Sequence, residues 1–521
     1  MSQSKIWNVP FKHISHFSTA RLSNNLRKQN GAIDKKWQPV IGLEIHAQIA
    51  SRSKLFSASP TQFNDPVNTN VSAFDAAFPG VQPQINGTCI DLGVKTALAL
   101  GSSVQPKSSF DRKHYFYPDL PFGYQITQHY EPFALGGFIQ LGEYDGIPHP
   151  YQIRIKQIQL EQDTGKSIHD IYPGFSLIDL NRAGIGLMEI VTEPDIRTAQ
   201  DAGLVVRKLQ ALLRCVGSSN GNMEEGSMRC DVNVSIREPG GEFGTRCELK
   251  NLSSVKFLMD AIEAEVRRQI NLLEHGMPVR QETRGYDASA RKTFLLRTKE
   301  TAPDYRYMPE PDLPPLLLSS SYITRIKSTI PELPDQKRER MLREYGIPLR
   351  DVNAMLNEPQ GVEYYEELCN PSEGKKRDPR KAANWMVHEL FGQLHTRDLT
   401  FIKNPVSPGQ LGSVLDLVEM GVISGKIGKN VVSVMVEGDS RMAQAIVEER
   451  GWKVIEGGEE LEIVCEKIMA KYPDKVMAVK GGNHNLLKWF VGQVMQATRG
   501  KASPKKVIEV LESKLIGKKE K

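Results

Sequence analysis

Residues 40–49, VIGLEIHAQI, place polar side chains at every second position, which is the spacing that gathers them on one face of a β-strand. Glu44, His46 and Gln48 would project together, opposite an apolar face. A glutamate and a histidine two residues apart suit half of a site for a hard cation or a metal-bound phosphate. An ordinary solvated strand has the same pattern, so this stretch alone leaves both interpretations open.

Residues 223–251 combine the most reactive side chains, and their pattern predicts a reactive-site hairpin. Apolar and polar residues alternate strictly over residues 230–236, and Pro239 with nearby glycines supplies the turn. We expect Glu248 to face Asp231 across this hairpin. The polar face would present two acids together with cations, of which four residues are candidates for the site: Arg229, Asp231, Glu248 and Lys250.

Residues 153–167, IRIKQIQLEQDTGKS, alternate again after a β-bulge that we expect near Lys156. Gln157, Gln159 and Glu161 would then share one face. The ending resembles a P-loop, but Leu160 stands where a P-loop needs a glycine, which excludes that motif. Lys166 keeps a candidate role as a phosphate contact.

Residues 179–196, DLNRAGIGLMEIVTEPDI, place Glu189 between Met188 and Ile190 in an apolar run. A carboxylate in such surroundings needs a cation, a metal or solvent beside it. Arg182, in the glycine-containing start of the same segment, is a further candidate for phosphate binding.

Residues 111–128 interleave basic and aromatic side chains around prolines. We expect a loop in which Arg112 and Lys113 hold phosphate while tyrosines stack on a base or a ribose. The same composition is also typical of a rigid, well-packed loop.

The composition bounds the class of protein. A chain of 521 residues is long enough for two to four domains. Its formal charge of +5 is small for that length, so nucleic-acid contacts would have to come from local basic patches. The six cysteines form no CxxC pair, which argues against a disulfide framework. No apolar run approaches the ~20 residues needed to span a bilayer, so membrane insertion is not expected.

Taken together, these strings resemble the glutamyl-tRNA(Gln) amidotransferase family, and within it the B subunit in its mitochondrial form. Further matching strings are ELKNLSS, KTFLLRTKETAPDYRYMPEPDLPPL and NHNLLKWFVGQVMQATRGKASP. The resemblance runs from about residue 38 to the end of the chain. It implies that the protein uses ATP to activate the side-chain carboxylate of glutamate misacylated onto tRNA(Gln). It also implies a glutaminase partner of the A type, which supplies ammonia, and a small bridging third subunit of the C or F type.

The resemblance also assigns roles to residues. The metal-binding cluster, expected to hold Mg²⁺, falls on Glu44, His46, Glu161, Glu189, Asp231 and Glu248. All of these except Glu189 are also expected to be catalytic. Binding of the ATP phosphates falls on Arg112, Lys113, Lys166, Arg182, Arg229 and Lys250.

Two departures from the family pattern bear on metals. Many members carry two successive acids where this chain has Glu161 and Gln162. Many also carry a cysteine zinc knuckle where Ser57, Ser72 and Asp75 stand here, so we expect no zinc.

The fold class expected is α+β, with a largely antiparallel sheet followed by a helical domain and an all-helical tail. Residues 1–37 are basic and nearly free of acids, which predicts a mitochondrial presequence and a location in the matrix; a disordered basic arm or a plastid transit peptide are alternatives. Residues 38–325 would form the catalytic cradle, residues 326–404 a connecting helical domain, and residues 405–521 a tail that binds tRNA.

The tail has recognisable helix signals. Ser407, Pro408 and Gln410 predict a capped helix start. From Lys480 onward basic residues outnumber acids, which is typical of a surface that binds phosphate backbones but also of a solvated tail.

Overall fold

The computed structural model describes residues 36–169, 174–298, 304–372, 374–453, 459–481, 485–498, 501–502 and 504–515. The predicted presequence therefore lies almost entirely outside the described residues. The chain divides into two compact units, Met1–Pro331 and Glu332–Lys521. Among the described residues, no helix is both long and apolar enough to span a bilayer.

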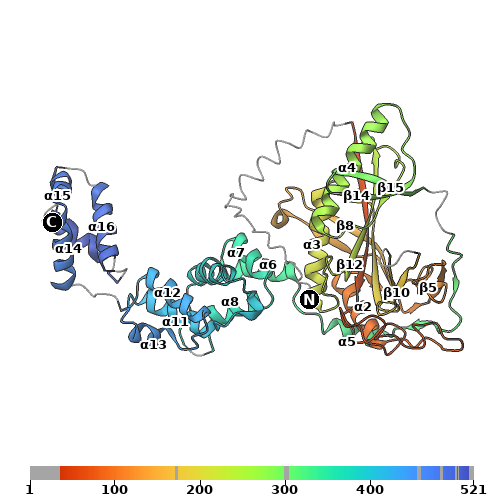
Figure 1. The fold of residues 1–521 in the computed structure, drawn as a ribbon, viewed down its shortest axis with the longest axis horizontal. Coiled ribbons are helices and arrows are strands. Elements are labelled where there is room, and N and C mark those ends of the chain that lie inside the picture. Colours follow the sequence, from red (N-terminus) through yellow and green to blue (C-terminus); the bar gives the residue numbers. More distant parts are fainter. Residues whose placement is uncertain are drawn as a thin grey trace, which may run out of the picture. The chain divides into compact units, whose positions relative to one another are not determined.

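The first unit mixes strands and helices (Figure 1). Its strands are β1 (Gln38–Gln48), β2 (Ser103–Val104), β3 (Lys107–Ser108), β4 (Asp111–His114), β5 (Tyr124–Thr127), β6 (Ala134–Leu135), β7 (Phe138–Leu141), β8 (Tyr151–Gln162), β9 (Lys166–Ile168), β10 (Leu177–Asp179), β11 (Gly186–Thr192), β12 (Met228–Arg237), β13 (Cys247–Leu249), β14 (Glu282–Asp287), β15 (Lys292–Thr298), β16 (Met308–Pro309) and β17 (Leu316–Leu317). Its helices are α2 (Gly87–Ala99), α3 (Ala199–Val216), α4 (Val255–Glu274) and α5 (Ser320–Lys327), with a 3₁₀ turn at Glu143–Asp145.

One large sheet organises this unit, in the order β15-β14-β13-β12-β1-β11-β8-β6-β2, with β7 paired to β8. Its pairs are antiparallel except for β13 with β14. β1 lies between β11 and β12, so the strand that carries Glu44 and His46 has neighbours on both sides. The predicted antiparallel α+β class is confirmed.

Alternation along β1 decides which face of the sheet is buried. Ile41, Leu43, Ile45 and Ala47 are at most 1% exposed and belong to the main hydrophobic core. Leu209 of α3 and other residues of α3 and α4 join the same core, so these helices cover that face (Figure 1). The even-numbered residues of β1 are left on the opposite face, as the sequence predicts.

Capping contacts define both ends of α3. The side chain of Thr198 accepts a hydrogen bond from the backbone of Asp201, and Gly217 ends the helix in the left-handed conformation with φ of 72°.

The predicted hairpin is present, with a register that corrects one expectation. β12 pairs with β13 so that Asn233 lies opposite Glu248, which places Lys250 rather than Glu248 across from Asp231. The returning strand is shifted by two residues because the connecting loop, residues 238–246, fixes where pairing resumes.

Two other expectations on strands have opposite outcomes. The bulge near Lys156 is confirmed, because Val191 pairs with Gln157 while Thr192 pairs with Ile155. The expected loop at residues 111–128 is wrong in part, since β4 and β5 pair there as a short hairpin. Its prolines lie in the connection between the two strands, where they do not interrupt pairing.

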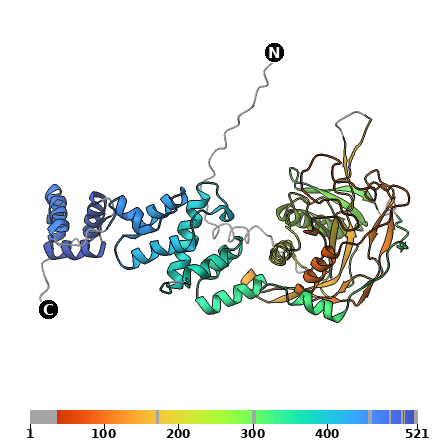
Figure 2. The same ribbon diagram turned by 90° about the horizontal axis from the view of Figure 1, so that it is seen from below.

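The second unit is helical in its described residues (Figures 1 and 2). Its helices are α6 (Pro334–Tyr345), α7 (Leu349–Leu356), α8 (Gly361–Cys369), α9 (Pro379–Asn384), a π-helical turn (Trp385–Leu390), α10 (Phe391–His395), a 3₁₀ turn (Phe401–Lys403), α11 (Pro408–Glu419), α12 (Gly425–Val436), α13 (Ala443–Glu449), α14 (Glu459–Lys471), α15 (Pro473–Lys480), α16 (Asn485–Ala497) and α17 (Pro504–Leu515).

This unit contains two separate hydrophobic cores, one built from residues 341–447 and one from residues 461–515. The predicted capping box is confirmed, because Ser407 and Gln410 exchange hydrogen bonds at the start of α11. In α16, Phe490 and Val494 are fully buried, so the apolar stripe of this helix is core.

Candidate functional site

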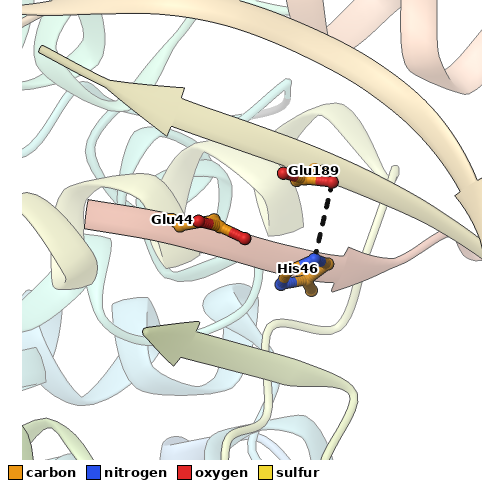
Figure 3. A group of neighbouring side chains, drawn as sticks. All are labelled: Glu44, His46 and Glu189. Carbon is orange, nitrogen blue, oxygen red and sulfur yellow. Dashed lines mark ion pairs between the residues drawn. The ribbon is translucent and has the colours of Figure 1, made fainter. Parts of the chain in front are cut away.

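Glu44 and His46 of β1 and Glu189 of β11 meet on the open face of the large sheet (Figure 3). Their potential ligand atoms all lie within 4.8 Å of one another. His46 stands directly opposite Glu189 in the strand pairing, and its Nε2 lies 3.6 Å from a Glu189 oxygen. The pairing of two strands thus converts sequence alternation into a three-residue cluster.

Glu161 of β8 lies at the edge of this cluster, 3.8 Å from His46 Nε2. Its side chain is 3% exposed, and Gln125 donates a hydrogen bond to it at 2.7 Å. Among the residues that the structure describes, the other oxygen, Oε2, has no hydrogen-bond partner, although Lys113 Nζ is 3.8 Å away. A buried carboxylate oxygen without a hydrogen bond is costly, and a bound cation would satisfy it.

Protonation of the cluster reflects its crowded carboxylates. Burial raises the pKa of Glu44 to about 7, and repulsion by Glu189 adds to the shift. Burial also disfavours the charged form of His46. This effect is outweighed by the hydrogen bond and charge of Glu189 and by the negative charges of Glu161 and Glu44, which raise the pKa of His46 to about 9. Burial works against ionised Glu189 too, yet His46 holds its pKa at about 2. The cluster therefore holds protons at neutral pH that a cation would displace.

A second group of charges lies beside Glu44, on the hairpin. Lys250 pairs with Asp231 and lies 3.2 Å from Glu248. Glu248 also accepts a hydrogen bond from Thr283 at 3.0 Å. Glu248 therefore belongs to this lysine-centred group, at the side of the tight cluster.

Arg229 and Arg182 meet at an acid that the sequence analysis did not single out. Asp163 is 4% exposed and lies 2.8 Å from Arg229 and 3.5 Å from Arg182. Arg182 also donates to the backbone carbonyls of residues 164 and 165. Asp163 continues the alternation of Gln157, Gln159 and Glu161, and that spacing could have identified it.

Two amides were also missed as parts of the site. Gln159 donates to Glu189 at 2.8 Å, and Gln125 donates to Glu161. Gln159 was placed on the correct face by its spacing. Gln125 gave no such signal, because its strand was expected to be a loop.

Two predicted phosphate contacts are not brought to the cluster. Arg112 is on the other side of β4 from Lys113 and forms a bidentate ion pair with Glu310, with Asp312 at 3.0 Å. Lys166 is exposed on β9, which belongs to a separate two-stranded sheet.

Lys54 and Asp75 form a fully buried ion pair of 3.1 Å at the segment where family members were expected to carry a zinc knuckle. Ser57 donates to Asp75 at 3.0 Å, and the backbone of Ser72 donates to it at 2.8 Å. Lys54 also reaches the carbonyl of Leu180, two residues before Arg182. Burial lowers the pKa of Lys54, although Asp75 opposes this effect. The pair links this segment to the loop that carries Arg182.

The donor set fits a divalent cation. Glu44 and Glu189 supply the carboxylate oxygens that Mg²⁺ prefers, and Glu161 adds the unsatisfied oxygen described above. Lys113 and Lys250 stand on opposite sides, where they can contact anionic ligands. This arrangement suits electrostatic stabilisation of a phosphoryl group.

Comparison with known proteins assigns the chain. Residues 39–324 match the GatB/GatE catalytic domain, which includes every residue of the cluster, and residues 363–515 match the GatB domain. The chain belongs to the GatB/GatE family.

Bacterial relatives of this family member cover nearly its whole length. The B subunit of the aspartyl/glutamyl-tRNA(Asn/Gln) amidotransferase from Xanthobacter autotrophicus is 46% identical over 481 residues, which is 92% of this chain and 96% of the relative. The proteins of the same name from Methylobacterium sp. and Rickettsia bellii are also 46% identical over 92% of this chain, covering 96% and 98% of their own lengths.

Proposed function

We propose that this chain uses ATP to phosphorylate the side-chain carboxylate of glutamate on misacylated Glu-tRNA(Gln), and then amidates it to Gln-tRNA(Gln) with ammonia. The observation that carries the proposal is the cluster of Glu44, His46 and Glu189 inside the domain that matches the family. The names of the relatives support tRNA amidation as the reaction class.

The side chains present suit this chemistry. The substrate carboxylate is itself the nucleophile toward the γ-phosphate, so the protein needs positioning and charge stabilisation rather than a reactive serine or cysteine. Burial raises the pKa of Cys230, the cysteine closest in sequence to the site, well above its ordinary value, which makes it a poor nucleophile.

We assign roles by position. Glu44, His46, Glu189 and Glu161 would hold Mg²⁺, which when bound would neutralise phosphate charge. Lys113 and Lys250 would attract the phosphates from either side. Asp231 would hold Lys250 in place through their ion pair, and Arg229 would be oriented by Asp163.

The partners and the location are part of the proposal. Ammonia would come from a glutaminase partner of the A type, with a small third subunit of the C or F type. The basic, acid-poor composition of residues 1–37 supports import into the mitochondrial matrix.

The test uses the complex of this chain with its glutaminase partner and misacylated tRNA. We expect ADP, phosphate and Gln-tRNA(Gln) as products, and no Gln-tRNA(Gln) when the isolated chain is given glutamine. Formation of AMP and pyrophosphate would indicate an unrelated ligase. Full turnover in a complex that carries Glu189→Gln would indicate a scaffold that only presents tRNA. Because the relatives are named for both acids, Asp-tRNA(Asn) is assayed in parallel.

A further inference from the structure

A cavity of about 390 Å³ lies between helix α4 and the start of strand β15, at the edge of the large sheet. β15 is the last strand of that sheet, and α4 packs against it and against β12 (Figure 1). The helix covers the buried face of the sheet, whereas the cluster of Glu44, His46 and Glu189 lies on the open face. The cavity is therefore separate from the site described above, with the sheet between them.

The lining of this cavity is rich in hydrogen-bond donors and in positive charge. None of the described residues that line it is an acid, and its polar side chains are Arg267, Arg268, Asn271, Arg291, Lys292 and Thr293. Arg267, Arg291 and Lys292 are exposed, and in the part of the chain that the structure describes none of the three forms an ion pair. Like charges gathered in one cavity repel one another, so an anion that neutralises them would be bound favourably.

Arg268 is held in the wall of the cavity by a buried acid. Glu265 is fully buried and accepts hydrogen bonds from Arg268 Nε at 2.9 Å and Nη2 at 2.7 Å. Thr293 donates to the same carboxylate at 2.9 Å, which ties β15 to α4. The bidentate contact fixes the plane of the guanidinium, and among the described residues its Nη1 has no hydrogen-bond partner. One wall of the cavity is thus rigid and keeps a donor for a ligand.

The opposite wall is the turn between β14 and β15. Asp287 caps this turn, because it accepts hydrogen bonds from the backbone of Ser289 and Ala290. Arg291 follows in the left-handed conformation, with φ of 52°, which L side chains rarely adopt. A backbone conformation of this kind costs free energy and is most common beside sites that bind a ligand. The turn thus delivers Arg291 and Lys292 to the cavity at a cost that the fold itself does not explain.

We propose that this cavity is a second anion site, which binds phosphate groups on the face of the sheet opposite the cluster. Guanidinium groups match pairs of phosphate oxygens, and three of the four cations are arginines. Asn271 adds an amide donor, and a single carboxylate would leave most of the positive charge uncompensated. The volume lies within the roughly 300–1,000 Å³ that is typical of ligand sites. Two sources share this chemistry: a free polyphosphate anion and the phosphodiester backbone of an RNA.

The test removes the three exposed cations together in the full-length chain, as Arg267→Gln, Arg291→Gln and Lys292→Gln. Glutamine keeps much of the side-chain length and suits a helix. Because the change also relieves repulsion between like charges, the midpoint of thermal unfolding should not fall. Arg291→Gln alone is the second variant, and it decides the question if the triple variant does not fold.

The matched control also replaces two arginines and a lysine by glutamine in the same unit. The three residues are exposed and form no ion pair among the described residues: Arg52, Arg280 and Lys327. Their loss changes the net charge of the protein by the same amount. Any difference between the triple variant and the control therefore comes from the cavity.

Binding of inorganic pyrophosphate is measured by isothermal titration calorimetry in buffer without Mg²⁺. Under this condition the carboxylates of the cluster repel the anion, so the cluster does not contribute. We expect the wild type and the control to bind pyrophosphate equally well. The affinity should fall by roughly tenfold or more in the triple variant, and by about threefold to tenfold in Arg291→Gln.

A short RNA duplex distinguishes the two sources of phosphate. If RNA is the occupant, the logarithmic salt dependence of duplex binding should be shallower in the triple variant than in the control, by roughly 0.7–0.9 per lost contact. If only pyrophosphate binding changes, the occupant is a free polyphosphate anion.

Pyrophosphate affinity and RNA salt dependence that equal those of the control would overturn the assignment of the cavity. A lower unfolding midpoint together with unchanged binding would show that the cations are structural. These measurements need no turnover, so they are independent of the proposed function, which would fail separately if the wild-type complex made no ADP with misacylated tRNA.

Discussion

The sheet face of the first unit and the terminal helices of the second use charge in opposite ways. On the sheet, Glu161 and Glu189 are nearly buried, and both lie close to His46 of β1. Lys113 of β4, a strand of a separate sheet, lies 3.8 Å from Glu161. In the terminal helices, lysines such as Lys505 and Lys506 are exposed.

The buried charges on the sheet indicate a role in the reaction, whereas the exposed lysines of the tail indicate attraction of a polyanion. Buried charges cost free energy unless they are paired, so a convergent buried group is a sign of a function that needs it. Exposed lysines cost little and act on a polyanion through its counterions. We therefore expect changes on the sheet to affect turnover, and changes in the tail to affect binding.

The largest effect should come from Glu189→Gln, which keeps the size of the side chain and removes one charge beside His46. We expect turnover in the assembled complex to fall on the order of a thousandfold. Glutamine can still accept the hydrogen bond from Gln159, so the midpoint of thermal unfolding should change little. An unfolded variant would show that the cluster is structural.

The next largest effect should come from Asp75→Asn, which leaves the Lys54 ammonium buried without its counter-charge. Breaking a fully buried ion pair costs about 3–5 kcal/mol of unfolding free energy. Asp304→Asn breaks a pair whose partners are both 81% exposed and should cost less than about 1 kcal/mol. Equal losses of unfolding free energy in the two variants, measured by denaturant unfolding, would contradict the distinction between buried and exposed charge.

The buried charges also show how much of the site could be predicted from the sequence. Alternation identified the faces of β1, β8 and β12, and hence most of the cluster, because period-2 spacing survives in the fold. It could not give the register of β13, because the long loop before this strand decides where pairing resumes.

Contacts between segments that are distant in the chain could not be predicted from the sequence. Arg112 has the right charge for phosphate but is engaged by Glu310, almost 200 positions away. Lys54 and Asp75 become a pair only when the chain folds around them. Residue type proposes candidates, and tertiary packing decides which of them face the site.

A smaller effect should come from Glu265, a fully buried acid away from the cluster. Burial opposes its charge, but Arg268 and Gln269 hold its pKa below the ordinary value. Its contribution to stability is therefore present above the ordinary glutamate pKa and is lost as the pH falls through the lowered one. Glu265→Gln should lose about 1–3 kcal/mol at pH 7 and much less at pH 3, measured by denaturant unfolding. A loss that is independent of pH would contradict this account.

The smallest effect should come from the tail, where Lys501, Lys505 and Lys506 are changed together to alanine. Lys514 is left in place, because it is paired with Glu462 and Glu466. We expect weaker tRNA binding across sequences and a logarithmic salt dependence that is shallower by roughly 0.7–0.9 per lost contact.

Turnover at saturating tRNA should stay near the wild-type value, since no reacting group has been changed. The matched control replaces Lys376, Lys403 and Lys426, three exposed lysines of the first helical segment of the same unit. A salt dependence that equals that of the control would mean that the tail lysines are only solvated. A loss of turnover at saturating tRNA would mean that the tail also positions the aminoacylated end of the tRNA. Binding of tRNA and catalysis would then not be separate functions of the tail and the sheet.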